Sequence, residues 1–297
     1  MLPGPQTLAV LGLLAVTAVW GSTFVMIADI VTRIDVADLL AARFTIAALL
    51  LLPFALRAIR RMSQRTIGYG VLLGLAYGTA QFLQTYGLAH TSPALSGFLT
   101  SMYVVLTPLL AFVMFRVPLS GRIAIALVLA LAGVAVLTLR GGGLAIGIGE
   151  VLTLASAAVY ALHIVLLSRW SNRGDVFGLT AVQLLVLGAV SVLMALPGGI
   201  ALPENRRDLA VVLYLAIAAG VVAVLVQTWG QSHLPAARAA IVMCMEPVWA
   251  AGFAVAFTAQ ALTGRLVLGG TSILAGMLVA EVRPPSGDEG RGEPLPH

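Results

Sequence analysis

The sequence predicts an all-α integral membrane protein, with ten transmembrane helices in two inverted five-helix repeats around a central cavity. Three observations predict this fold. The chain is 60% hydrophobic and only 10% charged, whereas soluble domains average about 25% charged residues. It contains ten apolar runs of the length that crosses a bilayer. Its two halves resemble each other, as in transporters that bind substrate between two repeats.

Composition also excludes several function classes. All 17 basic residues are Arg and the chain has no Lys. A nucleotide-binding P-loop and a retinal Schiff base both require Lys, so neither is expected. The one cysteine, Cys244, rules out an internal disulfide and a cysteine-based metal cluster. We therefore expect no cofactor, no metal and no nucleic-acid partner.

The ten predicted spans are separated by breaks that carry Arg, Pro or Gly, and the first run lacks the basic start of a cleavable signal peptide. The polar, Pro- and Gly-rich tail, residues 284–297, is expected to be disordered. The predicted spans are residues 7–28, 37–56, 66–89, 93–115, 122–139, 147–168, 176–196, 208–231, 236–258 and 265–282.

A seven-residue motif provides the strongest sign of a repeat. Gln84–His90 (QTYGLAH) returns as Gln227–His233 (QTWGQSH), and the offset between the two copies is 227 − 84 = 143. Leu119–Arg122 returns as Leu262–Arg265 at the same offset. His90 and His233 each end a predicted helix, where the ring can bond the last carbonyl groups.

The distribution of Arg sets the predicted orientation. With the N-terminus inside, eleven Arg residues fall on the inner side of the membrane and five on the outer side, so both termini are predicted to be cytoplasmic. Five helices per repeat is an odd number, so the second repeat is inverted. We divide the chain into a first repeat, 1–140, and a second, 141–283. We expect the protein to lie in a bacterial-type inner (plasma) membrane.

Four motifs carry a family resemblance: Trp20–Phe24, Ala42–Phe44, Tyr86–Ala94 and Leu106–Leu109. In this order, and with the duplication, they resemble the drug/metabolite transporter superfamily and its ten-helix EamA-type exporters. Within that group the chain is similar to YddG-type exporters of aromatic and other hydrophobic amino acids. The Gly-Glu pair that often follows helices 4 and 9 is absent here, so any role of that Glu does not transfer.

Polar and aromatic residues follow single faces of several predicted spans, and such residues usually face a cavity or another helix. Hydrogen bonding between helices is the alternative explanation for each Ser or Thr. Apolar and cation–π surface would come from the aromatic members. The predicted substrate-binding residues are Trp20, Tyr77, Gln81, Gln84, Tyr103, Tyr160, His163, Gln227, Glu246 and Trp249.

Glu246 is the only carboxylate near the middle of a predicted span. It could bind a substrate ammonium, carry a coupling proton or form a structural pair. Because 246 − 143 = 103, it is the repeat equivalent of Tyr103, and the two are expected to approach the site from opposed helices. His163 is either a site residue or a satisfied core histidine. Arg43 is expected to extend toward the outer membrane surface.

The function predicted from these features is secondary export of small neutral or zwitterionic metabolites, with aromatic or hydrophobic amino acids favoured, by alternating access. A multidrug or cationic-compound exporter is the alternative, and a nucleotide-sugar or sugar-phosphate antiporter or a channel is less favoured. No enzyme motif is found. The expected partners are a small-molecule substrate and the lipid bilayer, with the protein as a monomer.

Overall fold

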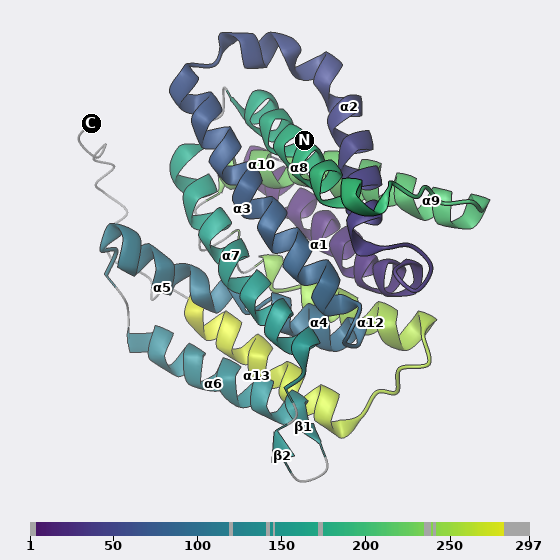
Figure 1. Ribbon diagram of the computed structural model, residues 1–297. Coiled ribbons are helices and arrows are strands. Elements are labelled where there is room, and N and C mark those ends of the chain that lie inside the picture. Colours follow the sequence, from purple (N-terminus) through teal and green to yellow (C-terminus); the bar gives the residue numbers. More distant parts are fainter. Residues whose placement is uncertain are drawn as a thin grey trace.

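The computed structural model describes residues 4–118, 121–140, 143–144, 146–171, 175–234, 239 and 242–281. The predicted disordered tail lies outside the described residues. The described part is almost entirely helical (Figure 1). Its α-helices are α1 (Pro5–Ile30), α2 (Val36–Arg61), α3 (Gln64–Leu88), α4 (Pro93–Thr100), α5 (Tyr103–Phe115), α6 (Gly121–Thr138), α7 (Ile148–Trp170), α8 (Val176–Ala195), α9 (Arg206–Tyr214), α10 (Ala223–His233), α12 (Glu246–Phe257) and α13 (Gly264–Glu281).

Helix starts follow local capping chemistry. The Asp35 side chain accepts a hydrogen bond from the Ala37 amide at 2.8 Å and caps α2. Ser63 caps α3 through the Thr66 amide at 3.1 Å, and Asn205 caps α9 through the Asp208 amide at 2.8 Å. These oxygens satisfy amides that have no partner within the first helical turn.

Seven helical stretches in the described part are long and apolar enough to cross a membrane. Helices α12 and α13 are shorter apolar helices, and α3 interrupts its apolar run with polar residues such as Gln81 and Gln84. Ten spans therefore remain a prediction. The seven stretches are Pro5–Ile30, Val36–Arg61, Pro93–Phe115, Gly121–Thr138, Ile148–Trp170, Val176–Gly198 and Arg206–His233.

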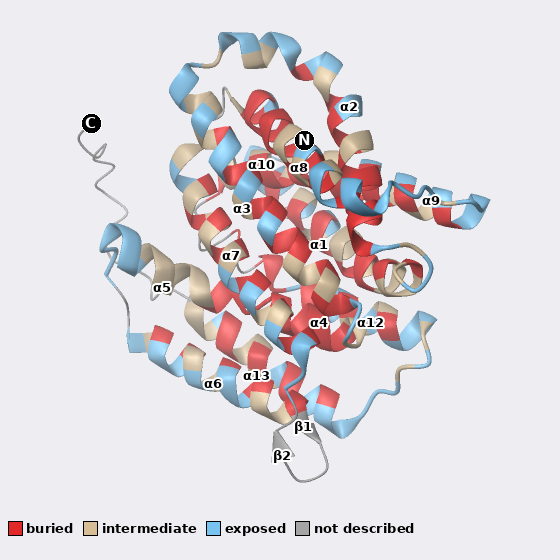
Figure 2. Ribbon diagram, in the orientation of Figure 1, coloured by how far each residue is buried: buried red, intermediate tan, exposed pale blue. Residues whose placement is uncertain are grey.

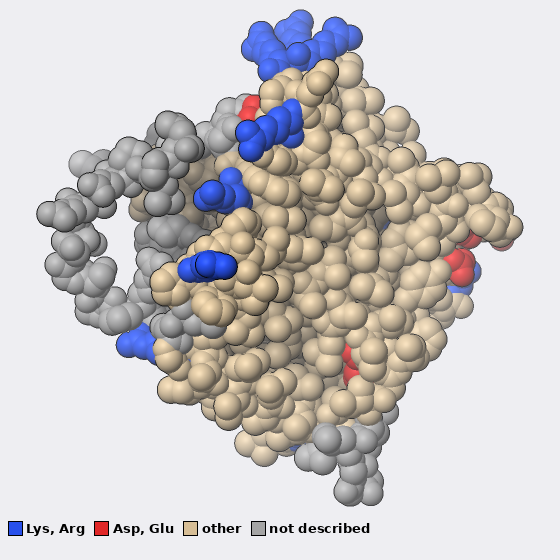
Figure 3. Space-filling model, turned by 60° about the vertical axis from the view of Figure 1, so that its left-hand side comes forward, with Lys and Arg blue, Asp and Glu red and all other residues tan. Residues whose placement is uncertain are grey.

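The surface suits a lipid environment. Large apolar side chains such as Phe54, Val113 and Phe257 are 73–78% exposed, and the burial pattern in Figure 2 places buried residues on the inward faces of the helices. In Figure 3 the centre of the face is broad and uncharged, while basic side chains lie at the top and down the left-hand side of the view. An extensive uncharged surface is typical of a multi-pass membrane protein.

The helices of the two halves pack in matching pairs. Helix α2 packs along α8, α3 packs against α7, α1 packs against α10 and α12, and α4 packs against both α7 and α12. Figure 1 shows α6 and α13 side by side at one edge of the bundle, next to α4 and α5. A cluster of buried residues joins most of these helices into one hydrophobic core.

The α6–α13 contact is reciprocal. A Cβ built on Gly133 would lie 2.6 Å from the Gly269 carbonyl oxygen, and a Cβ built on Gly276 would lie 2.7 Å from the Ala126 carbonyl oxygen. Gly276 is the repeat equivalent of Gly133, and Gly269 is that of Ala126, since 276 − 133 = 269 − 126 = 143. Each of the two helices therefore presents the same face to the other, as two identical subunits do across a two-fold axis. Only glycine permits this close approach.

A second pair of equivalents shows the same relation. The Ser272 hydroxyl of α13 donates to the Leu129 carbonyl oxygen of α6 at 2.8 Å, and the two positions are also 143 apart. Residues that touch their own equivalents lie next to a two-fold axis. The axis relating α6 and α13 therefore passes between Leu129 and Ser272.

Two local features differ from a plain run of helices. Leu139–Arg140 (β1) and Gly143–Leu144 (β2) form a short antiparallel pair at the boundary between the two predicted repeats. Residues Leu215–Val222 (η2) form a π-helix between α9 and α10. Such segments are often found at functional sites.

Candidate functional site

The described helices enclose a central cavity that is polar and aromatic. Its space for water-sized molecules is about 50 Å³, and one water needs about 10–15 Å³ on this measure. The cavity thus has room for a few waters, and a larger solute would require it to widen. Its lining residues are Trp20, Thr23, Phe24, Ile27, Arg43, Tyr77, Gln81, Gln84, Thr100, Tyr103, Tyr160, His163, Ile164, Gln227, Met243 and Glu246.

Both halves break a helix where the chain reaches this cavity. Helix α4 ends at Thr100, a turn occupies Ser101 and Met102, and α5 begins at Tyr103. In the second half a turn occupies Cys244 and Met245, and α12 begins at Glu246. The two turns are equivalent in the repeat, since 244 − 101 = 143. Broken helices near the centre of a membrane fold are typical of transporter binding sites.

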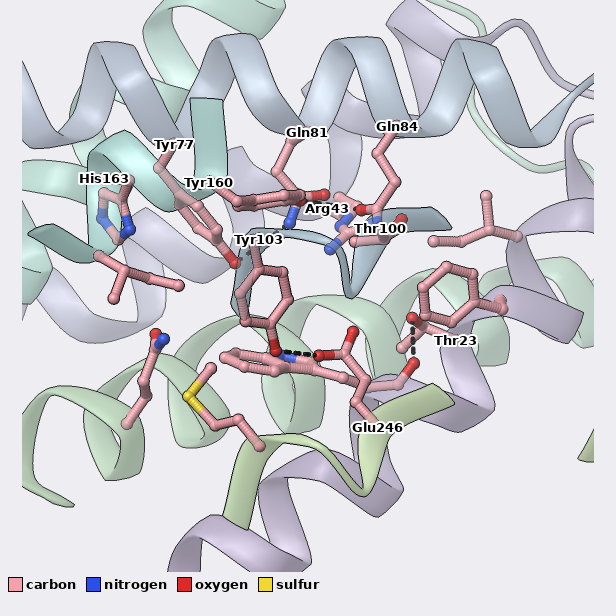
Figure 4. Close-up of a pocket in the computed structure, with 16 residues that line it drawn as sticks. Thr23, Arg43, Tyr77, Gln81, Gln84, Thr100, Tyr103, Tyr160, His163 and Glu246 are labelled. Atoms are coloured by element: carbon pink, nitrogen blue, oxygen red, sulfur yellow. Dashed lines mark hydrogen bonds between the residues drawn. The ribbon is translucent and has the colours of Figure 1, made fainter. Parts of the chain in front are cut away.

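Glu246 and Tyr103 meet in this cavity. The Tyr103 hydroxyl donates a 2.9 Å hydrogen bond to Glu246 Oε2 (Figure 4). Glu246 is only 5% exposed, and no ion pair within the described part of the chain includes it. The predicted approach of these two equivalents is thus confirmed. Since the contact joins a residue to its own repeat equivalent, it lies next to the two-fold axis, as the Leu129–Ser272 contact does.

Three tyrosines form an aromatic wall beside the carboxylate. The ring of Tyr160 lies 6.4 Å from that of Tyr103 and 6.0 Å from that of Tyr77, between centroids. The Tyr160 hydroxyl donates to Gln84 Oε1 at 2.8 Å, and Gln84 Nε2 donates to the Thr100 hydroxyl at 3.2 Å. These bonds tie α3, α4 and α7 together and hold the rings at the cavity.

Further contacts fix His163 and Trp20. His163 stacks on Tyr77 at 5.1 Å, and its Nε2 lies 2.8 Å from Gln183 Oε1. The ring is therefore anchored to α8, as expected of a satisfied core histidine, while still lining the cavity. Trp20 Nε1 donates to the Ala219 carbonyl oxygen at 3.1 Å. That carbonyl belongs to the π-helix η2, so the π-helix positions the indole.

The structure brings together nine of the ten predicted site residues: all line the cavity except Trp249. Trp249 is 39% exposed and stacks on Phe253 at 6.0 Å. Trp249 lies three residues after Glu246 in the same helix, α12, where it packs beside Gly21 of α1 and not among the lining residues. Gln227 is 4% exposed and lines the cavity from α10.

Arg43 also lies in a different place from the one that the sequence predicts. It is 3% exposed and lines the cavity instead of extending to the surface. Helix α2 begins at Val36, so Arg43 lies seven residues, about 10 Å, inside it. Its guanidinium lies over the Phe44 ring, 4.4 Å from the centroid. The polar pattern also misses four apolar lining residues, namely Phe24, Ile27, Ile164 and Met243.

The two histidines of the repeated motif lie away from the cavity. His90 Nδ1 is 2.9 Å from the Tyr86 carbonyl oxygen, and His233 Nδ1 is 2.9 Å from the Trp229 carbonyl oxygen. Both bonds close the last turn of a helix. The expected helix-end role is confirmed, and the repeated spacing of the motif reflects helix termination.

A multi-helix fold with an apolar surface and a buried polar cavity defines the class as a multi-pass membrane transporter. The EamA-like transporter family matches residues 7–139 and, a second time, residues 147–281. The chain therefore belongs to the EamA-like transporter family, within the drug/metabolite transporter superfamily.

Two further similarities agree with this assignment. The chain is 29% identical over 277 residues to an uncharacterized transporter of Archaeoglobus fulgidus, across 92% of this chain and 85% of that protein. A protein of known crystal structure superposes with a TM-score of 0.69 at 20% identity, across 92% of this chain and 96% of the other. At that identity the second likeness concerns the fold alone.

Proposed function

We propose that this transporter exports small neutral or zwitterionic metabolites, with aromatic and hydrophobic amino acids as substrates, in the manner of YddG-type exporters. The observation that carries the proposal is the cavity itself. Among the described residues that line the cavity, the one carboxylate is Glu246, which is buried and faces a wall of three tyrosines. A carboxylate attracts an ammonium group, and tyrosine rings attract both cations and apolar side chains.

We further propose alternating access between two inverted five-helix repeats, residues 1–140 and 141–283, that together span the membrane ten times with both termini cytoplasmic. Support comes from the contacts between equivalents, Tyr103 with Glu246 and Leu129 with Ser272. Inverted repeats rock around a site at their common axis. In this state the cavity has room for a few waters, so we infer that an amino acid binds in a second, wider state.

Transport by the purified protein tests this proposal. Proteoliposomes loaded with labelled phenylalanine should release it saturably, and unlabelled phenylalanine outside should drive counterflow. Adding ATP should change nothing, because a secondary transporter is driven by a gradient. Release that neither saturates nor shows counterflow would indicate a channel.

The same assay separates the alternative substrates. Leucine, tryptophan, tetraphenylphosphonium and a nucleotide sugar should each be offered as competitors of phenylalanine. We expect tryptophan to compete best and the nucleotide sugar least. Competition by tetraphenylphosphonium alone would favour a multidrug or cationic-compound exporter and overturn the amino-acid proposal.

A further inference from the structure

Arg43 is a buried cation without a matching anion. Its Nε and Nη1 atoms have no hydrogen-bond partner although the side chain is 3% exposed. No ion pair in the described part of the chain includes it. By contrast, Arg33 at the end of the bundle forms ion pairs with Asp29 at 2.8 Å and with Asp208 at 2.7 Å.

We propose that the Arg43 guanidinium is the carboxylate-binding group of the central cavity. An Arg side chain offers five N–H donors, and Nε and Nη1 carry three of them. Leaving such donors and a full positive charge unpaired in a buried place is unfavourable. A carboxylate ligand supplies both the charge and the acceptors, and its planar shape matches the guanidinium.

The position of Arg43 makes this pairing available to a solute in the cavity. Arg43 lines the same cavity as Glu246 and comes from α2, whereas Glu246 comes from α12. In Figure 4 Arg43 lies beside Gln81 and Gln84, and Glu246 lies on the far side of the space. The Phe44 ring, 4.4 Å from the guanidinium carbon, restrains the side chain from one face.

The two charges together select a zwitterion. An α-amino acid carries an ammonium and a carboxylate on one carbon, so it can satisfy Glu246 and Arg43 at once. An amine without a carboxylate can satisfy only Glu246. This division of roles rests on the proposed function, whereas the carboxylate site on Arg43 itself requires only an anionic solute.

Binding of matched solutes to the detergent-purified protein tests the proposal. The probes are phenylalanine, 3-phenylpropionate, which lacks the ammonium, and phenethylamine, which lacks the carboxylate. Arg43→Gln should weaken the binding of phenylalanine and of 3-phenylpropionate by about 30-fold or more, as expected when one partner of a buried charge pair is removed. Phenethylamine should bind within about twofold of wild type.

Two further variants keep the test decisive. Arg43→Lys retains the charge but loses the planar fork, and should give an intermediate loss for the two carboxylates alone. Arg57→Gln changes an exposed Arg on the same helix and should leave all three affinities unchanged. If Arg43→Gln does not fold, the affinities of Arg43→Lys for the three probes test the proposal instead.

The outcomes separate the two proposals. Equal losses for all three probes in a folded Arg43 variant, or a wild-type protein that binds neither carboxylate, would overturn the Arg43 assignment. Binding of 3-phenylpropionate through Arg43 without binding of phenylalanine would keep the assignment and refute amino-acid export. Tighter binding of phenyl phosphate than of 3-phenylpropionate would contradict a carboxylate site.

Discussion

The two ends of the bundle are equivalent in the repeat but differ in chemistry. At one end the segment after α1 of the first half meets α9 of the second through Arg33 and Asp208, whose two bonds measure 2.7 and 3.0 Å. At the other end α3 of the first half meets α7 of the second through Tyr69 and Trp170, whose rings stack at 4.4 Å and 5°. The predicted orientation places the ion-pair end outside and the aromatic end inside.

The equivalence of the ends is visible residue by residue. Asp208 of α9 is the repeat equivalent of Arg65 of α3, since 208 − 143 = 65. Arg65 does not form an ion pair within the described residues; its Nε donates to the Tyr69 hydroxyl at 2.6 Å and its guanidinium lies 5.6 Å from the Tyr69 ring. One position in the repeat therefore carries an acid at one end and a base at the other. The two equivalent positions therefore make different contacts: Asp208 binds Arg33, and Arg65 binds Tyr69.

Under the alternating-access mechanism proposed above, an ion pair would hold one end of the bundle closed and a ring stack would hold the other. Opening the ion-pair end separates charges, and the hydrogen bonds from Arg33 to Asp208 and Asp29 raise the pKa of Arg33 above its ordinary value. Opening the aromatic end exposes two rings to water. The first contact depends on salt and the second does not.

Breaking the ion pair should have the largest effect. Asp208→Asn removes the negative charge of a side chain that accepts two hydrogen bonds from Arg33. Each hydrogen bond to a charged group contributes roughly 1.5–3 kcal/mol. We expect a cysteine at Thr23, which lines the cavity, to react at least about tenfold faster with an impermeant maleimide added outside. The measurement uses Cys244→Ser as the background.

Arg207→Gln is the matched control for this variant, because Arg207 is 79% exposed and its contact with Asp29 is 3.5 Å long. Its labelling rate should stay within about twofold of the background, as for most exposed ion pairs. Equal labelling of Asp208→Asn and the background would show that the ion pair does not close this end.

The α6–α13 interface provides a symmetric reference for the asymmetric ends. Gly133→Ala and Gly276→Ala each insert a methyl group into a close contact with the other helix, and overpacking costs about 1–3 kcal/mol. Both variants should lower the midpoint of thermal unfolding in detergent by a similar amount. Gly68→Ala, where nothing lies near the added carbon, should not lower it.

A large drop for one of the two glycines and none for the other would contradict the two-fold relation. It would mean that α6 and α13 are held by different contacts despite their matching sequences.

Weakening the aromatic end should have a smaller effect than Asp208→Asn. Trp170→Ala removes the stack with Tyr69, and such aromatic pairs contribute about 0.5–1.5 kcal/mol beyond their buried area. The Thr23 cysteine should become about threefold to tenfold more reactive from the inner side in inside-out vesicles. Trp170→Phe retains a ring, so its labelling rate from the inner side should stay close to that of wild type. Faster labelling of Trp170→Ala from the outer side would mean that the aromatic end faces outside.

Salt should give the smallest and most specific difference. Raising ionic strength from about 0.1 M to 1 M shortens the screening length from about 10 Å to about 3 Å. Labelling from the ion-pair side should rise by about twofold, and labelling from the aromatic side should not change. An equal rise on both sides would mean that salt acts on the whole protein and not on Arg33 and Asp208.

The repeat provided the most reliable site prediction. An offset of 143 places Tyr103 opposite Glu246, and a hydrogen bond joins them. Polar stripes then predict the neighbouring cavity residues, because a polar side chain in a span needs a partner or a cavity. The division into repeats and the ten spans remain predictions.

The errors have local physical causes. Trp249 lies in the same helix as Glu246 but packs against α1 at Gly21, a contact that no pattern of polar residues reveals. Arg43 lies close enough to the start of its predicted span to suggest a surface position, but its guanidinium lies over the Phe44 ring and lines the cavity. The π-helix Leu215–Val222 is uniformly apolar, so no pattern reveals its wider turn.

We expect Glu246 to be the ionisable group of the transport site, and a comparison of wild type with Glu246→Gln across pH tests this. The change keeps the shape of the side chain and removes its charge. A charge at the bilayer centre costs roughly 2.5–3.5 kcal/mol, so we expect Glu246→Gln to express and fold at least as well as wild type.

The measurement is the initial rate of phenylalanine efflux from proteoliposomes between pH 5.5 and 8.5, in steps of about half a unit. We expect Glu246→Gln to lower efflux by about tenfold or more, as for a lost bond to a charged group, or to remove the dependence of efflux on pH. Tyr103→Phe, which removes only the hydroxyl bonded to Glu246, should retain a pH dependence. Efflux by Glu246→Gln that matches wild type in rate and pH profile would show that Glu246 is not the ionisable group of the transport site.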